Sequence, residues 1–442
     1  MKIFFSWLNA LLVSLICYSA LAQNQTQDPY ASIESPNDPF SDVEAGEVVD
    51  DELSIHDIRA ELKGYFQNND LRDYHPFNPY SNDNQWLDDS IKHLGLDISL
   101  ESSWNSRWSS RIRAFNRYQS FGSDKSDLNK TSLLEAAISW RAENNRLNFE
   151  LGRRKPQWSE GYSYDIANLL QPQRTKPYVD QDDPLQSKGW DMLSLQYIDE
   201  YWSYSGYYLN SESEFYDSNS EFVLRLAYQG DNSASLILQQ ITEDQLAMAI
   251  TFGRLLTDNL SLRTEWTAHP YRQKTLIGDS EELNDYYYRL VAGANYTADS
   301  GWSLLTELFY NQHGLTDNEW QQNSLAIAAA AARVLSEQSL DPVADFELAF
   351  KGFDFIRSGW LRRNYLSLLY TSAETANSWQ MKLYSQLNLD DNSFLTRVEL
   401  IKSFNDHLTA RFQVESFNGC ELCEYGLNPN ERSSRLVFSW LF

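Results

Sequence analysis

Charged residues at alternate positions are the feature of this chain that most clearly suggests a chemistry. In the stretch 105–117, four arginines stand at odd-numbered positions and Trp108, Ile112 and Ala114 at even-numbered ones, and Glu101 and Glu135 stand in the neighbouring stretches. The planar guanidinium group binds carboxylate and phosphate groups through paired hydrogen bonds, and fixed charges can replace the hydration shell of a solute inside a channel. If the apolar residues face lipid, the candidate pore-lining residues are Arg107, Arg111, Arg113, Arg117, Glu101, Glu135, Arg225, Arg263, Glu265, Arg289, Glu307, Arg397, Glu399, Arg411 and Glu415.

Two interpretations of these charges stay open at the level of the sequence. They select solutes in a water-filled bore, or they pair with one another and close it. Both follow from the same alternation, and arginines on a lipid-facing surface would be costly near the membrane midplane, so both place the charges inside.

A period of two residues positions these charges and predicts strands. Leu94, Leu96, Ile98 and Leu100 share one face, whereas a helix would group its apolar residues three and four positions apart. About eighteen segments follow this pattern, with sixteen to eighteen as the expected range. They lie near 57–66, 93–103, 105–117, 132–143, 146–155, 189–199, 201–210, 220–230, 233–243, 246–254, 259–269, 286–297, 301–312, 360–372, 378–389, 394–404, 407–417 and 433–442.

The connections between these segments alternate in length. Long polar loops follow most odd-numbered segments and tight turns follow most even-numbered ones. Outer-membrane barrels have short periplasmic turns and long outer loops. We therefore predict an all-β fold, a transmembrane antiparallel β-barrel. The long loops are 67–92, 118–131, 156–188, 270–285, 313–359 and 418–432.

The N-terminal region predicts export. Residues 1–22 carry Lys2 as their only charge, then an apolar run and a small-x-small pattern, which is typical of a signal peptide cleaved before Gln23. Residues 23–55 are acidic and rich in Gln, Asn and Pro, which predicts a disordered leader ahead of a barrel over 56–442. The formal net charge of −26 argues against nucleic acid as a partner.

The last segment strengthens the membrane interpretation. Leu436, Phe438 and Trp440 share a face with Phe442, the final residue. Here the chain resembles bacterial outer-membrane barrels of the Gram-negative type, whose final strand ends in an aromatic residue. The resemblance implies that the barrel-assembly machinery recognises Phe442, and that the barrel lies among outer-membrane lipids.

A second resemblance covers roughly residues 93–197. The stretch Leu151–Tyr162, followed by Gly189-Trp190-Asp191 and preceded by Ser132–Ala136, is similar to a stretch in uncharacterised porin-like families and in alginate-export barrels. The resemblance implies the barrel architecture and leaves the solute open.

The cysteines and the longest loop carry further expectations. Cys420 and Cys423, in an oxidising compartment, are predicted to form a disulfide that pins the last outer loop. Two cysteines without a nearby histidine are too few for a structural zinc site, so no metal or other cofactor is expected. Ser324–Leu335 is predicted to be helical, within a loop that either constricts the pore, forms a lid or simply packs.

The sequence gives little indication of catalysis, because no histidine lies in a nucleophile elbow or in a pair with metal-ligand spacing. His269 is the least implausible catalytic base, and Ser261 on the same predicted strand matches no known catalytic spacing. A channel for a hydrophilic, anionic or saccharide solute is the leading hypothesis. The alternatives are a closed barrel serving as the membrane partner of a periplasmic or surface complex, and an outer-membrane lipid-modifying enzyme.

Overall fold

The computed structural model describes residues 54–72, 75–79, 89–121, 127–159, 161–170, 189–209, 222–230, 232–242, 245–270, 286–356 and 361–442. The predicted signal peptide and nearly all of the predicted leader lie outside these residues. The chain divides into two units, Met1–Val48 and Val49–Phe442, and all described residues belong to the second.

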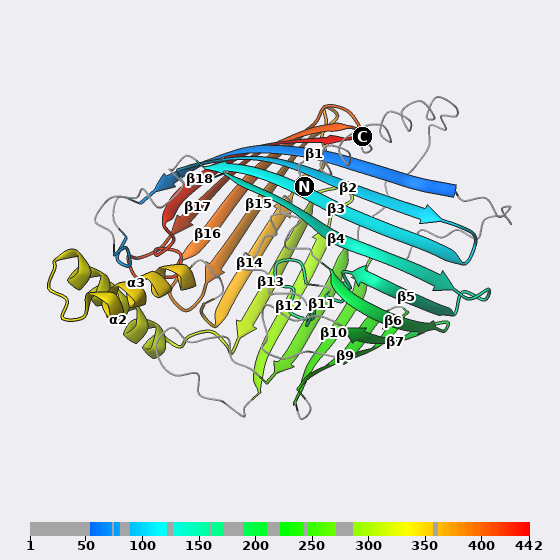
Figure 1. Ribbon diagram of the computed structural model, residues 1–442, viewed down its shortest axis with the longest axis horizontal. Coiled ribbons are helices and arrows are strands. Elements are labelled where there is room, and N and C mark those ends of the chain that lie inside the picture. The colour runs from blue at the N-terminus through cyan, green and yellow to red at the C-terminus, as the bar shows by residue number, and fades with distance from the viewer. Residues whose placement is uncertain are drawn as a thin grey trace, which may run out of the picture. The chain divides into compact units, whose positions relative to one another are not determined.

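The described residues form one eighteen-stranded sheet (Figure 1). Each strand pairs antiparallel with the next, and the last strand, β18, pairs with the first, β1, for example through Leu62 and Trp440. The sheet therefore closes on itself, and the predicted antiparallel barrel of eighteen strands is confirmed. The strands are β1 Ser54–Leu71, β2 Ser90–Ser103, β3 Trp108–Phe121, β4 Leu128–Arg141, β5 Leu147–Arg154, β6 Trp190–Ile198, β7 Trp202–Leu209, β8 Phe222–Gln229, β9 Asn232–Thr242, β10 Gln245–Thr257, β11 Leu260–His269, β12 Tyr287–Thr297, β13 Ser303–Asn311, β14 Asn364–Thr371, β15 Trp379–Asn388, β16 Phe394–Ser403, β17 Leu408–Asn418 and β18 Asn430–Leu441.

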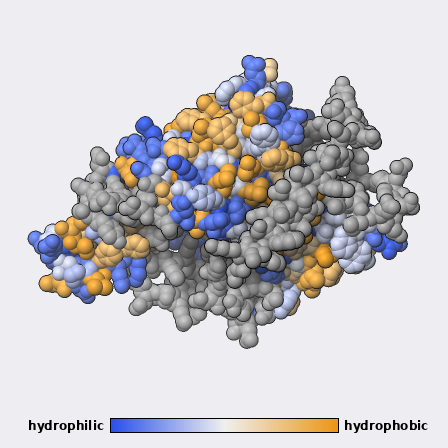
Figure 2. Space-filling model, turned by 45° about the horizontal axis from the view of Figure 1, so that its top comes forward, coloured by the Kyte–Doolittle hydropathy of each residue, from blue (hydrophilic) through white to orange (hydrophobic). Residues whose placement is uncertain are grey.

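The two faces of the sheet differ in the way that the period of two predicts. Large apolar side chains such as Leu94, Leu224 and Phe438 are exposed on the outer face. Figure 2 shows apolar side chains gathered over the wall around β1 and its neighbours. Polar and charged side chains such as Asp97 and Glu307 are buried on the inner face.

Backbone irregularities adjust the inner face at β4 and β5. The β3–β4 register shifts between Arg113 and Ala114, so Leu134 and Glu135 both lie buried on the inner side. Gly152 in β5 has a φ of 131°, and a Cβ there would stand 2.2 Å from the Ala136 carbonyl oxygen. Only glycine tolerates this combination.

Two helices occupy the long connection between β13 and β14: α2 Asp317–Leu335 and α3 Pro342–Ile356. The helix predicted at 324–335 is the C-terminal part of α2, which begins seven residues earlier at a capping box formed by Thr316 and Glu319. The second helix, α3, was not predicted. Within the described residues, neither helix has the length and apolarity needed to cross a membrane.

The helices lie beyond the strand ends, on the long-loop side of the barrel (Figure 1). Trp320 and Ile327 of α2 and Phe353 of α3 pack with Phe77 of the β1–β2 connection and Leu427 of the β17–β18 connection. The two helices thus join loops that are distant in the sequence.

Candidate functional site

The segment that runs along the inner face of the barrel comes from the connection after β5, not from the longest loop. We call residues 156–170, of which residue 160 is not described, the inner segment. Its apolar residues Trp158, Ala167, Leu169 and Leu170 pack against inward-facing side chains of β6 to β10, such as Ile237. Apolar packing against this wall therefore holds the inner segment in place.

Two buried glutamates anchor the inner segment by its backbone. The Glu265 carboxylate accepts hydrogen bonds from Ser159 Oγ at 2.7 Å, from the Gly161 N–H at 2.6 Å and from the Ala167 N–H at 3.1 Å. The Glu307 carboxylate accepts from the N–H groups of Tyr162 and Ser163, at 2.9 and 2.7 Å. A buried carboxylate needs such donors because burial removes its hydration.

Tyr164 completes the anchoring further round the barrel. Its ring stacks on Phe309 with centroids 4.3 Å apart, and its hydroxyl shares a hydrogen bond of 2.7 Å with Ser367 Oγ. The Gln386 amide also donates to this hydroxyl, at 2.5 Å. The inner segment is therefore bound to β11, β13, β14 and β15 by side chains that all point inward.

The opposite wall carries paired charges that water reaches. On β2 and β3, Arg111 and Glu101 pair at 2.5 Å, and their side chains keep 32% and 47% exposure. The Arg113 guanidinium binds Asp97 through two nitrogens, at 3.0 and 2.7 Å. By contrast, the Glu307 side chain under the inner segment has 0% exposure. We call the inner face of β2 to β5 the charged wall.

Most of the sequence-predicted charges occupy the inner face, and many of them meet in pairs. Arg263 pairs with Glu307 at 2.9 Å, Arg397 with Glu415 at 2.9 Å, and Glu135 with Arg154 at 2.8 Å. Arg289 donates to Asn311 Oδ1 at 3.1 Å. The strand registers place Arg117, Arg225, Glu399 and Arg411 on the same face.

Arg107 differs from the prediction. It lies in the turn between β2 and β3 and pairs with Glu143 of the next turn, so it stands at the short-turn end of the barrel and not on a strand. Strand β3 begins one residue later, at Trp108, because residues 104–107 form the reversal between two paired strands.

The sequence predicts Glu265 and Glu307 as pore-lining residues but does not predict the inner segment that covers them. The signal was available: the connection after β5 contains Trp158, Tyr164 and Ile166, which are unusually apolar for an exposed loop.

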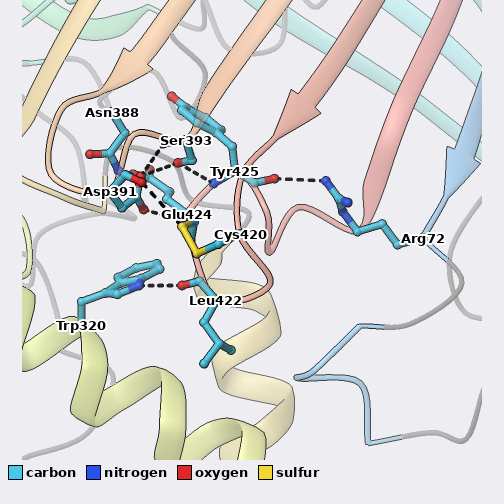
Figure 3. Close-up of a disulfide and its surroundings, with 10 residues drawn as sticks. Arg72, Trp320, Asn388, Asp391, Ser393, Cys420, Leu422, Glu424 and Tyr425 are labelled. Carbon is cyan, nitrogen blue, oxygen red and sulfur yellow. Dashed lines mark hydrogen bonds between the residues drawn. A yellow bond between two sulfur atoms is a disulfide. The ribbon is translucent and has the colours of Figure 1, made fainter.

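A second inward connection, residues 419–429 between β17 and β18, meets the same network. We call it the latch loop. Cys420 and Cys423 form a disulfide within it, with an S–S distance of 2.01 Å. Figure 3 shows this disulfide beside Glu424 and Tyr425. The Tyr425 hydroxyl donates to Gln386 Oε1 at 2.5 Å, so Gln386 joins the latch loop to Tyr164 of the inner segment.

Two titratable groups at the latch loop have displaced pKa values. The Glu424 carboxylate accepts hydrogen bonds from the Tyr365 hydroxyl and the Asn388 amide, and burial raises the pKa of Glu424 to about 7. His75 Nδ1 accepts from the Phe77 N–H, so its Nε2–H donates to the Leu427 carbonyl at 2.6 Å. Burial lowers the pKa of His75 to about 4.

The described residues offer little support for a metal or a Ser–His centre. Among them, no group of three or more His, Cys, Asp or Glu side chains is placed to hold a metal ion. Ser261 and His269 both lie on β11, eight positions apart, which separates them by roughly 26 Å along an extended strand. These two residues therefore do not form a catalytic pair.

Comparison with known proteins shows a shared fold at very low sequence identity. No protein-family model matches the chain, and no curated protein matches it. Among solved structures, OpdK of Pseudomonas aeruginosa, crystallised with vanillate, is similar with a TM-score of 0.50 and 10% identity, over 87% of this chain and 98% of OpdK. OpdL of the same organism gives the same four values. OpdK is an outer membrane protein of Pseudomonas aeruginosa.

Proposed function

We propose that this protein is an outer-membrane channel through which small hydrophilic solutes diffuse. The observation that carries the proposal is the contrast between its surfaces: an apolar outer face, and an inner charged wall whose Arg111 and Glu101 side chains remain a third to a half exposed. Charged side chains inside a closed barrel keep such exposure where water enters the bore. The shared fold with the outer membrane protein OpdK supports the same conclusion.

The inner segment gives the channel its selectivity in this proposal. It covers the wall formed by β6 to β15 and leaves solutes to pass along the charged wall. Fixed guanidinium and carboxylate groups there replace part of a solute's lost hydration. Anions and saccharides, including acidic saccharides, are the solute classes that we favour, because guanidinium groups bind carboxylates and phosphates through paired hydrogen bonds.

Assembly follows from the same proposal. Cleavage before Gln23 would release the chain into the periplasm, and the assembly machinery would recognise the strand that ends at Phe442. In the structure, the Phe442 N–H donates to the Ala60 carbonyl of β1, and its exposed ring stacks near Trp440 with centroids 5.9 Å apart.

Single-channel recording of the refolded full chain in a planar bilayer, under a salt gradient, tests the proposal. We expect steady openings. Arg111→Gln should shift the reversal potential toward cation preference and Glu101→Gln toward anion preference, because each removes one charge from the same pair. Lys351→Gln on the outside of α3 is the matched control and should change neither. A silent bilayer from protein shown to be folded would overturn the proposal.

One observation favours a second candidate, a closed barrel that serves as the scaffold of a periplasmic or surface complex. The inner segment and the latch loop together fill part of the bore, and their residues Tyr164 and Leu427 are fully buried. A silent bilayer would turn the search toward protein partners of this closed form.

A further inference from the structure

The latch loop is built around a disulfide that is open to solvent on one side. Cys420 is exposed, whereas Cys423 and the four residues after it are buried. The Cα atoms of the two cysteines are 5.0 Å apart. The disulfide therefore joins the exposed part of the loop, at Cys420, to its buried part, at Cys423.

The same loop binds the helices at the mouth of the barrel. The Trp320 indole of α2 donates to the Leu422 carbonyl, between the two cysteines, at 2.8 Å (Figure 3). Leu422 also packs on the apolar cluster that joins α2 and α3, and Leu427 lies inside that cluster. The four-residue ring closed by the disulfide thus makes the hydrogen bond to α2, and Leu427, beyond the ring, packs in the same apolar cluster.

The buried half of the loop reaches the inner segment. The Glu424 carboxylate accepts from the Leu361 N–H at 3.1 Å and from the Tyr365 hydroxyl at 2.8 Å, which fixes the loop to the start of β14. Next to it, the Tyr425 hydroxyl binds Gln386, whose amide donates to Tyr164. One side chain, Gln386, therefore lies between the latch loop and the inner segment.

The first connection of the barrel is attached to the latch loop as well. Arg72 donates to the Asn428 carbonyl of the loop at 2.9 Å and to the Phe417 carbonyl of β17, just before the loop, at 2.8 Å, and His75 donates to Leu427. The loop consequently contacts segments from the beginning, the middle and the end of the chain. If it loosens, contacts at all three places weaken together.

We propose that the Cys420–Cys423 disulfide is a thiol-sensitive latch: a small thiol in the external medium reduces it, the loop releases α2 and the inner segment, and the channel conducts more. This inference rests on the proposed channel function and adds a mode of regulation to it.

The chemistry needs only the disulfide and two thiol molecules. A thiolate attacks the sulfur of the exposed Cys420, forms a mixed disulfide there and expels the Cys423 thiolate, which takes up the proton that the first thiol lost. A second thiolate attacks the added sulfur and expels the Cys420 thiolate, which takes up the proton of the second thiol, and the two small thiols leave as a disulfide. Two electrons pass from two thiols to the protein disulfide.

Opening the ring loosens the loop because the released loop then has more conformational entropy. For a ring of four residues, the entropy that the disulfide removes corresponds to a roughly 20-fold increase in the population of the released loop when the disulfide is reduced. Loss of the ring geometry at Leu422 also weakens the hydrogen bond that the Trp320 indole of α2 donates to the Leu422 carbonyl.

The experiment compares oxidised and dithiothreitol-reduced wild-type protein by two readouts. Hydrogen exchange in peptides from α2 and from residues 161–170 should accelerate on reduction, by up to about 20-fold. The open probability or conductance in planar bilayers should rise in parallel. The double variant Cys420→Ser/Cys423→Ser should match reduced wild type and should ignore the reductant, which controls for effects of thiol elsewhere.

The outcomes separate the latch from the channel. A conducting protein whose exchange rates and openings are identical in both redox states would refute the latch and leave the channel intact. Faster exchange on reduction with a silent bilayer in both states would instead refute the channel, together with the claim that release raises conductance.

Discussion

Replacing Glu265 by alanine should release the inner segment from the barrel wall. The Glu265 side chain is 1% exposed and accepts three hydrogen bonds from the segment, donated by Ser159 Oγ and by the N–H groups of Gly161 and Ala167. The variant leaves all three donors without this acceptor. The Gly161 N–H still donates to Ser159 Oγ at 3.1 Å, but the Ala167 N–H regains a partner only if water enters, which requires the segment to move off the wall.

The size of the effect follows from these contacts. Hydrogen bonds to a charged group contribute about 1.5 kcal/mol each at the lower end of the usual range, or about 4.5 kcal/mol for three. Removing the carboxylate also relieves the cost of burying its charge, which lowers the net loss to about 3 kcal/mol. The undocked population should therefore rise roughly 100-fold, since each 1.4 kcal/mol is a factor of ten.

The test is hydrogen exchange at two amides that do not touch Glu265. The Tyr162 and Ser163 N–H groups donate to Glu307, and those bonds survive the substitution itself. If the segment undocks as a unit, both amides lose protection in Glu265→Ala. Ser159→Ala is the control: it removes one of the three bonds to Glu265, together with a longer one that Ser159 Oγ accepts from the Gly161 N–H at 3.1 Å, and should have an effect of about tenfold. Unchanged protection at Tyr162 and Ser163 would refute the reasoning, because the segment would then be held without Glu265.

Three further predictions concern assembly, pH and topology. Gly152→Ala should lower the yield of folded barrel in refolding assays, since its added Cβ would stand 2.2 Å from a β4 carbonyl oxygen; Gly206→Ala, whose Cβ meets nothing nearer than 3.8 Å, should leave the yield unchanged. The pKa of Glu424 is about 7 against an ordinary 4.5, so the folded loop binds the Glu424 proton more tightly than the released loop does. The latch loop should therefore be held less tightly as the pH rises from 4.5 to about 7. Glu424→Gln should abolish this pH dependence, measured as the hydrogen-exchange rate of the loop amides corrected for their intrinsic rates. A pH dependence that persists in the variant would show that another group causes it. A cysteine label at Gln338 should react on intact cells and one at Asn144 should not; the reverse pattern would invert the topology.

The strands were predictable from the sequence because their signal is local. In β2, alternate apolar residues such as Leu94 and Leu96 must share a face whatever their partners are, and the pattern repeats in all eighteen strands. The difference in length between the two sets of connections is likewise visible without coordinates. Fold class and the inward direction of most charges followed from these two signals.

The inner segment and the ion-pair partners were not predictable, because they depend on which distant strands meet. Ser159 and Glu265 are 106 positions apart, and no periodicity relates them. Arg113 pairs with Asp97, although the register places it opposite Ser99. Choosing between these partners requires the stagger of β2 against β3, which a single sequence does not specify.

The pairing of β1 with β18 has a consequence for the rate of folding. It brings Leu62 against Trp440, so the final contacts of the sheet join strands from opposite ends of the described chain. Non-local pairing of this kind is slow, since the chain loses loop-closure entropy before the paired strands make any stabilising contacts. Until it forms, β1 and β18 each present an unpaired edge that can pair with another chain. A synthetic peptide with the sequence of residues 430–441 should therefore compete for the edge of β1 and trap the chain open during refolding, while leaving the finished barrel untouched.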